Sequence, residues 1–256
     1  MDDNIAYLWN LAKAASKEGD IGTVNSTCSE ILRREPEFWY ARELPKHTRG
    51  HYSQFDQDIF IESFFSTHRP INRRFVEVGA FDGVHYSNVR RLIEKHGWTG
   101  LCIEPVQENY DKLVKSHEND GVICVQAAVG ESEGTAEIYV SRYPHLPDWG
   151  SDCASLSSEL CSRWTDEYGA EWRTEEVRVA TLTTLLDEAN IETFDFLSVD
   201  AEGHDLEVLR SLDFSRFHPQ LIIVEVGTSR DSLIAFLSKQ GYSVWRDLGQ
   251  DLILQG

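Results

Sequence analysis

The stretch Arg74-Phe-Val-Glu-Val-Gly-Ala-Phe-Asp-Gly-Val84 carries the strongest structural signal in this 256-residue chain. Its apolar residues from Phe75 to Val78 predict a buried β-strand. Gly79 to Gly83 predicts a tight turn, and we expect a helix from about Tyr86. Because glycine has no Cβ, a ligand can approach the backbone of such a turn closely, and the unpaired N–H groups at the helix start suit an anion. The stretch therefore predicts a ligand site at the end of a sheet strand.

Glu77 distinguishes this turn from one that binds the pyrophosphate of a dinucleotide. It lies inside the strand, just before the first glycine. A carboxylate there repels a pyrophosphate and attracts a cation. S-adenosylmethionine (SAM) carries an ammonium and a sulfonium group, so Glu77 favours SAM as the ligand and methyl transfer as the reaction. We expect Glu77 to lie near the ammonium group.

The composition indicates one substantial core and excludes several classes of protein. The chain is 41% hydrophobic, which suits one main domain with a small appendage. Its mean hydropathy is -0.38, and no apolar run approaches the roughly 18 residues of a membrane span. A net charge of -19 argues against a nucleic-acid partner, because phosphate binding needs a basic surface. The acidic start lacks the features of a signal peptide, so we expect a cytoplasmic protein.

Residues 1–44 are expected to form a separate helical hairpin. Apolar residues recur with helical spacing from Ile5 to Arg34, and Gly19-Asp20 interrupts the pattern in the middle. The pair resembles a single tetratricopeptide unit, which cannot bury its own apolar face. We therefore expect it to dock on the main domain or on a second subunit, as the contact of a homodimer; partner recruitment is the alternative. A polar linker over residues 44–52 follows.

Strand-like and helix-like runs alternate through the main domain, residues 52–256. This alternation predicts a Rossmann-like α/β fold, in which helices cover both faces of a doubly wound, mostly parallel sheet. The last two strands predict an antiparallel hairpin around Gly249, a departure that Rossmann-like SAM-dependent methyltransferases show. The expected strands are 74–79, 100–104, 122–129, 135–140, 177–180, 194–200, 221–226, 242–246 and 252–254, and the expected helices are 87–96, 108–117, 182–189, 205–212 and 231–240.

The irregular segment 141–173 is rich in large ring side chains. We expect it to cover the site as a substrate lid, because such rings suit the faces of sugars or polyketides. A packed segment without substrate contact is the alternative. The ring side chains in question are Tyr143, His145, Trp149, Trp164 and Tyr168.

Two further strand ends suggest contacts to a nucleoside. Glu104, followed by Pro105, ends a strand about twenty residues after the glycine turn, the spacing at which a carboxylate accepts both hydroxyls of a ribose. NAD-binding proteins use the same contact, so Glu104 alone does not identify the ligand. The small residues Ala127 and Ala128 end the next strand and leave room for an adenine ring.

The segment Leu197-Ser-Val-Asp-Ala-Glu-Gly-His-Asp205 brings three ionisable groups out of an apolar strand. Asp200 continues directly from that buried strand, where a carboxylate needs a partner. His204 has an ordinary pKa near 6.5 and is expected to act as the base that deprotonates an alcohol. Alternatively, Asp200, Glu202 and Glu225 could hold Mg²⁺, which lowers the pKa of a bound alcohol.

Several motifs together resemble the FkbM family of SAM-dependent methyltransferases, over residues 52–227. The upstream motif Ser53-Gln-Phe-Asp-Gln-Asp58 resembles that family's opening motif, in which glycine is usual where this chain has Asp56. The resemblance implies methylation of a hydroxyl on a sugar or a secondary metabolite, as in natural product biosynthesis. The other motifs that carry it are Glu77–Gly83, Ser87-Asn88, Gly97-Trp-Thr-Gly100, Ile103-Glu-Pro105, Ala127–Gly130, Ser198–His204 and Ile223–Glu225.

These observations define an expected site and two rival functions. His204, Asp200 and Glu202 form the expected catalytic group. An NAD(P)-dependent oxidoreductase, or a catalytically silent SAM-binding scaffold that recruits partners, is the alternative to a methyltransferase. The expected cofactor contacts are Glu77, Gly79, Ala80, Asp82, Gly83, Ser87, Asn88, Glu104, Pro105, Ala128 and Asp200.

Overall fold

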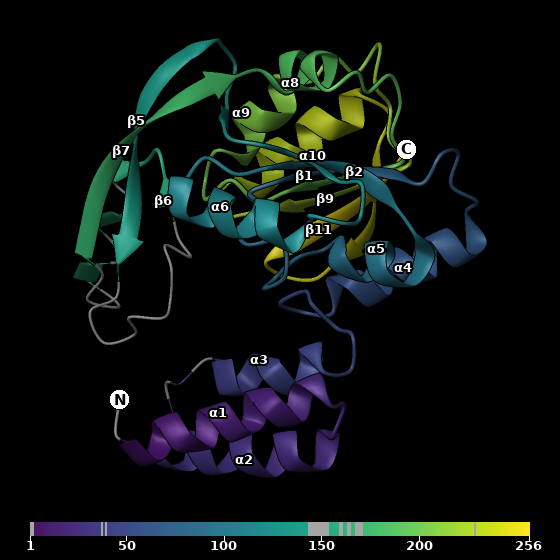
Figure 1. Cartoon of the computed structure of the whole chain (residues 1–256). Helices are drawn as coiled ribbons and strands as arrows, with labels where there is room; N and C mark the ends of the chain where they lie inside the picture. Colours follow the sequence, from purple (N-terminus) through teal and green to yellow (C-terminus); the bar gives the residue numbers. More distant parts are fainter. Residues whose placement is uncertain are drawn as a thin grey trace.

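The predicted α/β class is confirmed by a computed structural model of the chain, which shows a helical bundle attached to a larger layered domain (Figure 1). The structure describes residues 3–36, 38, 40–142, 154–158, 161–162, 165–166, 171–227 and 229–256. The five ring side chains expected in a substrate lid, Tyr143, His145, Trp149, Trp164 and Tyr168, lie outside the described residues.

The main sheet has seven strands in the order β10-β11-β9-β8-β1-β2-β3. Neighbouring strands from β9 to β3 run parallel, whereas β10 and β11 form the expected antiparallel hairpin at one edge. The chain leaves β1 toward β2 and β3 and later returns on the other side of β1 with β8. The strands are β1 (Arg74–Val78), β2 (Thr99–Ile103), β3 (Ile123–Val125), β8 (Phe196–Val199), β9 (Leu221–Glu225), β10 (Ser243–Asp247) and β11 (Asp251–Gln255).

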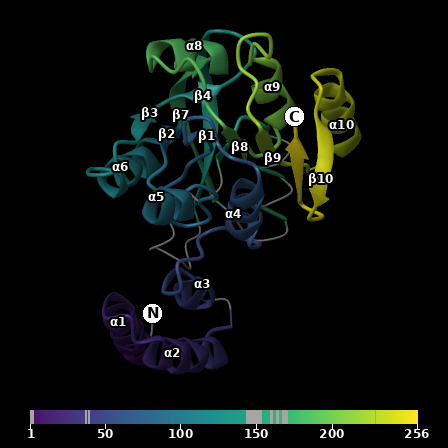
Figure 2. The same ribbon diagram turned by 90° about the vertical axis from the view of Figure 1, so that its right-hand side faces the viewer.

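Helices cover both faces of this sheet, because alternate strand residues point to opposite sides. On β1, Phe75 packs among residues of α4, α5 and α6, while Val76 packs among residues of α8, α9 and α10. Figure 2 shows α4, α5 and α6 on one side of the strands and α9 and α10 on the other. The helices are α4 (Gln57–Thr67), α5 (Arg90–His96), α6 (Gln107–Ser116), α8 (Leu182–Glu188), α9 (Asp205–Arg210) and α10 (Arg230–Lys239).

A second, smaller sheet departs from the sequence expectation. The single strand expected over 122–129 is divided, because β3 joins the main sheet while β4 (Ala128–Val129) pairs with β7 (Glu171–Ala180). Strand β7 also starts earlier than expected and pairs along its whole length with β5 (Gly134–Arg142). Five of its first six residues are polar, so they lack the alternation that marks a half-buried strand. Strand β6 (Ala154–Ser155) completes the order β4-β7-β5-β6.

The N-terminal region has three helices rather than the expected two. Helices α1 (Asp3–Lys17) and α2 (Ile21–Arg34) pack on α3 (Tyr40–His47), and Phe38 and Ala41 contribute to their shared core. The linker expected from residue 44 therefore begins inside a helix. Helix α3 is short, polar and contains a proline, so its sequence lacks the pattern that identifies longer helices. A homodimer through these helices stays a prediction.

The bundle contacts the main domain through α3 and the residues after it. Arg91 of α5 donates to the carbonyl of Gly50 at 2.7 Å, and the hydroxyl of Tyr52 donates to Glu94 at 2.7 Å. The rings of His47 and His85 lie 5.0 Å apart, so α3 reaches the turn that follows β1. Among the described residues, none of the helices is both long and apolar enough to span a membrane.

Candidate active site

The chain reverses its direction of winding between β1 and β8, and ligands of open α/β sheets bind at such a point, beyond the carboxyl ends of the strands. Val78 and Val199 are paired there, and the backbone N–H of Asp200 donates to the carbonyl of Val78 at 3.1 Å. A Cβ on Gly79 would lie 1.9 Å from the carbonyl oxygen of Asp200, and the φ of Gly79 is +78°. Only glycine can therefore occupy this position.

The turn after β1 is as tight as its glycines predict. Gly79, Phe81 and Gly83 all have positive φ values, and Ala80 is 2% exposed. A Cβ on Gly83 would lie 2.6 Å from Nε2 of His117, which occupies the space beneath the turn. The turn is thus fixed from below by a buried side chain that the sequence did not indicate as part of the site.

Glu77 lies beneath the turn rather than at the open edge. It is 3% exposed, and burial raises the pKa of its carboxyl to about 7. Its Oε1 accepts from the backbone N–H of Asn88 at 2.9 Å, and both of its oxygens lie 3.3 Å from Oγ of Ser87. A contact between Glu77 and a bound ammonium group stays a prediction.

Ser87 and Asn88 precede the helix that they were expected to start, because α5 begins at Arg90. Oγ of Ser87 accepts from the N–H of Arg90 at 3.1 Å, and Nδ2 of Asn88 donates to Ser198 on β8 at 3.0 Å. The Oδ1 atom of Asn88 is buried and has no partner among the described residues. These residues link β1, β8 and α5; their contact with the cofactor stays a prediction.

Glu104 directly follows β2 and lies next to the turn. Its contact with a ribose stays a prediction. Its Oε2 accepts from the N–H of Phe81 and its Oε1 from the N–H of Val106, both at 3.0 Å. Burial raises the pKa of this carboxyl to about 7. Nδ2 of Asn109 donates to Oε1 at 3.5 Å. A carboxylate offers about four acceptor positions, so these three bonds still leave acceptor capacity for the ribose. Pro105 then leads the chain away from the strand end.

Ala127 and Ala128 do not face an open space. Ala127 is 0% exposed within the main core, and Ala128 is 6% exposed within the core of the second sheet. The space expected for an adenine ring is thus not formed by these two side chains in this structure.

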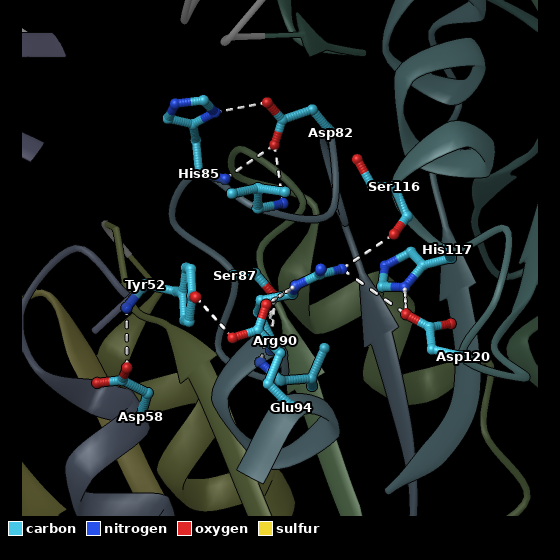
Figure 3. Close-up of polar contacts among 12 residues, drawn as sticks. Tyr52, Asp58, Asp82, His85, Ser87, Arg90, Glu94, Ser116, His117 and Asp120 are labelled. Carbon is cyan, nitrogen blue, oxygen red and sulfur yellow. Dashed lines mark hydrogen bonds and ion pairs between the residues drawn. The ribbon is translucent and has the colours of Figure 1, made fainter. Parts of the chain in front are cut away.

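Asp82 shapes the turn through its own carboxylate. Its Oδ1 accepts from the N–H groups of Val84 and His85 at 2.9 and 2.8 Å, and its Oδ2 contacts Nδ1 of His85 at 2.5 Å (Figure 3). Burial is the largest influence and raises the pKa of Asp82, but the bond to His85, the charge of His85 and the two backbone N–H bonds together outweigh it, so the net pKa is lower than usual. No sequence pattern indicated the role of His85.

A polar network supports the same turn from the side of α5. Arg90 donates to Glu94 at 2.8 Å and to the carbonyl of Ser116 at 3.0 Å, and Nδ1 of His117 lies 2.8 Å from Asp120 (Figure 3). The network thus joins α5 to the loop after α6 that holds His117 under the turn. These residues lie far apart between Arg90 and Asp120, on both sides of β2, which explains why no motif reveals them.

The backbone conformation of the upstream motif explains why glycine is usual in the family at the position of Asp56. Asp56 has φ +61° and makes no side-chain bond that caps α4. This left-handed conformation favours glycine. Asp58, in contrast, is fully buried and accepts from the N–H of Tyr52 and from Oγ of Ser53, both at 2.9 Å. The motif therefore fixes the entry into α4.

Carboxylates gather at the open edge around Asp200. Its side chain reaches solvent, but protein atoms crowd its carboxylate. This crowding, together with the charges of Glu225 and Glu202, raises the pKa of Asp200 well above its usual value. Asp251 on β11 adds to this charge and accepts from Gln57 at 2.8 Å. Sequence reasoning missed Asp251 because its strand runs antiparallel and delivers its first residue, not its last, to the edge.

The three carboxylates expected to hold Mg²⁺ are not assembled as a ligand set. Among the residues that the structure describes, no three His, Cys, Asp or Glu side chains are grouped so that they could hold a metal ion. Asp200, Glu202 and Glu225 therefore share an edge and a negative potential without forming a metal centre.

His204 stands at the start of α9 and does not cap it. Neither ring nitrogen has a hydrogen-bond partner among the described residues, and Nδ1 is buried. Instead Asp205 closes the loop, because its Oδ1 accepts from the N–H of Ala201 at 2.9 Å. Glu202 and Gly203 complete the loop with φ values of +48° and +91°. The imidazole of His204 is thus free of structural bonds within the described part of the chain.

Comparison with known proteins identifies the class. Residues 77–244 match the family described as the methyltransferase FkbM domain, which is more than half of the chain. The protein belongs to the FkbM family of methyltransferases, as the motifs predicted. A comparison with curated proteins found no significant match.

Solved structures of methyltransferases resemble the chain at low sequence identity. The METTL16 MTase domain is 14% identical, with 78% of this chain and 65% of that chain covered and a TM-score of 0.45. The human methyltransferase 10 domain containing protein is 13% identical, with 77% and 80% covered and a TM-score of 0.43. The O-methyltransferase from Bacillus cereus in complex with SAH is 12% identical, with 80% and 83% covered and a TM-score of 0.44.

Proposed function

We propose that the protein transfers the methyl group of SAM to a hydroxyl of a small molecule, such as a sugar or a secondary metabolite. The observation that carries this proposal is the edge between β1 and β8, where the tight glycine turn after β1 packs against Asp200, an exposed residue whose carboxylate lies among other acids. Open α/β sheets bind their ligands at such an edge, and a carboxylate there attracts a cationic ligand.

The residues at this edge fit the chemistry of SAM. The carboxylates around Asp200 suit the positive charges of the ammonium and sulfonium groups, which would in turn favour the ionised form of Asp200. Glu104 has acceptor capacity for ribose hydroxyls. When bound, SAM supplies an electrophilic methyl group. Asp200, Glu104 and the turn from Gly79 to Gly83 would hold it, while Glu77 and Asn88 fix that turn from beneath.

His204 is the residue best suited to accept the proton of the substrate hydroxyl. An alcohol is a weak nucleophile at neutral pH, and a positioned base contributes about 10²–10⁴-fold to the rate. The imidazole has no bond within the described residues that would occupy its acceptor nitrogen. Because the carboxylates are not grouped as a metal centre, the proposal contains no step that needs Mg²⁺; Glu202 shapes the loop between Asp200 and His204.

The experiment is methyl transfer from SAM labelled in its methyl group to a panel of hydroxylated acceptors, with wild type, His204→Ala and His204→Gln. We expect turnover by the wild type and a loss of at least 100-fold in both variants, with SAM affinity changed less than threefold. Turnover within a few-fold of wild type in both variants would remove His204 from the mechanism. Failure of SAM to bind the wild type would refute the proposed function itself.

A further inference from the structure

A groove lies beside His204, between the turn that joins β4 to β5 and the start of α9. Its volume is about 510 Å³, within the range of about 300–1,000 Å³ typical of small-molecule sites. Figure 1 shows the long antiparallel pair of β5 and β7 with one end near α9. Besides His204, the groove is lined by residues 129–136 and by Leu156, Val179, Glu207 and Arg210.

We propose that this groove binds the methyl acceptor, and that the acceptor is a hydroxyl-rich small molecule without negative charge. This inference rests on the proposed function and adds to it the place and the charge class of the acceptor.

The first argument is the position of His204. It lines the groove and also belongs to the loop that leaves β8 at Asp200. The second sheet is fixed to this loop, because Oγ of the buried Ser155 donates to the carbonyl of Glu202 at 2.9 Å. A molecule in the groove therefore lies against His204, the proposed base. The second sheet, which forms part of the lining, is hydrogen-bonded to the loop that leaves the expected cofactor edge at Asp200.

The second argument is the chemistry of the lining. The turn from Gly130 to Gly134 presents backbone groups and the hydroxyl of Ser132, while Leu156 and Val179 provide apolar surface. A carbohydrate-like molecule has both polar edges and apolar C–H faces, which suits such a mixed wall. The lining thus favours a polyhydroxylated acceptor over a wholly apolar one.

The third argument is charge. Three carboxylates, those of Glu131, Glu133 and Glu207, line the groove against a single cation, Arg210. Arg210 is already paired with Glu131 at 3.3 Å, so the groove carries a net negative charge. A carboxylate or phosphate on the acceptor would be repelled, whereas hydroxyl and ammonium groups can donate to Glu207.

A large side chain at position 134 is expected to block the groove. Apart from its two chain neighbours, no residue has an atom within 4 Å of a Cβ built on Gly134, so Gly134→Trp can place an indole in the open space. Glu137→Trp is a matched control, because Glu137 is exposed on the same strand and does not line the groove. Thermal unfolding and S-adenosylhomocysteine binding of both variants check that the fold and the cofactor edge are intact.

The experiment measures ligand binding by saturation-transfer NMR on the protein with S-adenosylhomocysteine, for three probes of one size: methyl glucoside, glucosamine and glucuronate. We expect signals from the first two and at least a tenfold weaker signal from glucuronate. Gly134→Trp should abolish the signals, and Glu137→Trp should keep them.

Absent signals in the wild type, equal signals from glucuronate, or signals that persist in Gly134→Trp would overturn the inference. S-adenosylhomocysteine binding separates the two proposals. If it binds while the groove fails its test, the proposed function stands and only the acceptor site is wrong. If it does not bind, the proposed function has failed.

Discussion

Replacing Glu77 with glutamine should stabilise the protein, and more so at higher pH. The folded-state pKa of Glu77 is about 7, against 4.5 for an ordinary glutamate. Between these values the folded state holds more protons than the unfolded state, so wild-type stability falls as the pH rises through this window. Glutamine keeps the shape, can accept from the N–H of Asn88, and can donate to Ser87, but carries no charge.

The magnitude follows from that difference in pKa. At 1.36 kcal/mol per unit, the charge of Glu77 costs the folded state about 0.8 kcal/mol at pH 5 and about 3.3 kcal/mol at pH 8. The stability of Glu77→Gln relative to wild type should therefore grow by roughly 2.5 kcal/mol between these pH values. For a domain of this size, that corresponds to a relative rise in Tm of about 5–10 °C.

The assay is urea unfolding of wild type and Glu77→Gln at pH 5 and pH 8, with Glu118→Gln as an exposed control. Other groups titrate equally in both proteins, so the comparison isolates position 77. If the free energies of unfolding of the two proteins differ by the same amount at pH 5 and pH 8, Glu77 is not in an environment that disfavours its charge, and the reasoning is refuted. In the same variant, SAM affinity within threefold of wild type would assign Glu77 to the turn alone, and a loss of tenfold or more would support contact with the ammonium group.

Three further substitutions test the cofactor edge and the entry into α4. Gly79→Ala should destabilise the protein by at least about 3 kcal/mol, because the new Cβ meets the backbone of Asp200; a soluble variant with wild-type Tm would contradict this close approach. Asp200→Asn should weaken SAM binding at least tenfold in calorimetry and raise the Tm at pH 8 more than at pH 5, since the raised pKa means that ionisation costs stability as the pH rises. The opposite pH trend would contradict the crowding of carboxylates. Asp56→Gly should stabilise the protein by about 0.5–1 kcal/mol in urea unfolding, because it relieves a left-handed residue without losing a cap bond; destabilisation would mean that the Asp56 side chain has an unseen role.

The sequence predicted the main sheet well because burial on both faces leaves long apolar runs. Phe75 to Val78 and Leu221 to Val224 show this, and the turn after β1 follows from its glycines, which must adopt positive φ. The winding reversal also follows from the order of strands, so Asp200 could be placed at the site from sequence alone.

Other features depend on contacts that no local pattern records. The polar start of β7 is a strand because β5 pairs with it. His117 matters because Gly83 lies above it, far away in the sequence. Glu77 was expected near the ammonium group of SAM, but no sequence pattern showed that its oxygens contact Ser87 and Asn88, since a strand residue's facing depends on register that apolar runs do not reveal.

The most direct test of the central claim is calorimetric titration of the purified protein with SAM, S-adenosylhomocysteine and NADH. A cofactor edge built from Gly79, Asp200 and Glu104 predicts micromolar binding of SAM and S-adenosylhomocysteine and no binding of NADH. Binding of NADH without binding of SAM would contradict the account and make the protein a nicotinamide-dependent enzyme instead.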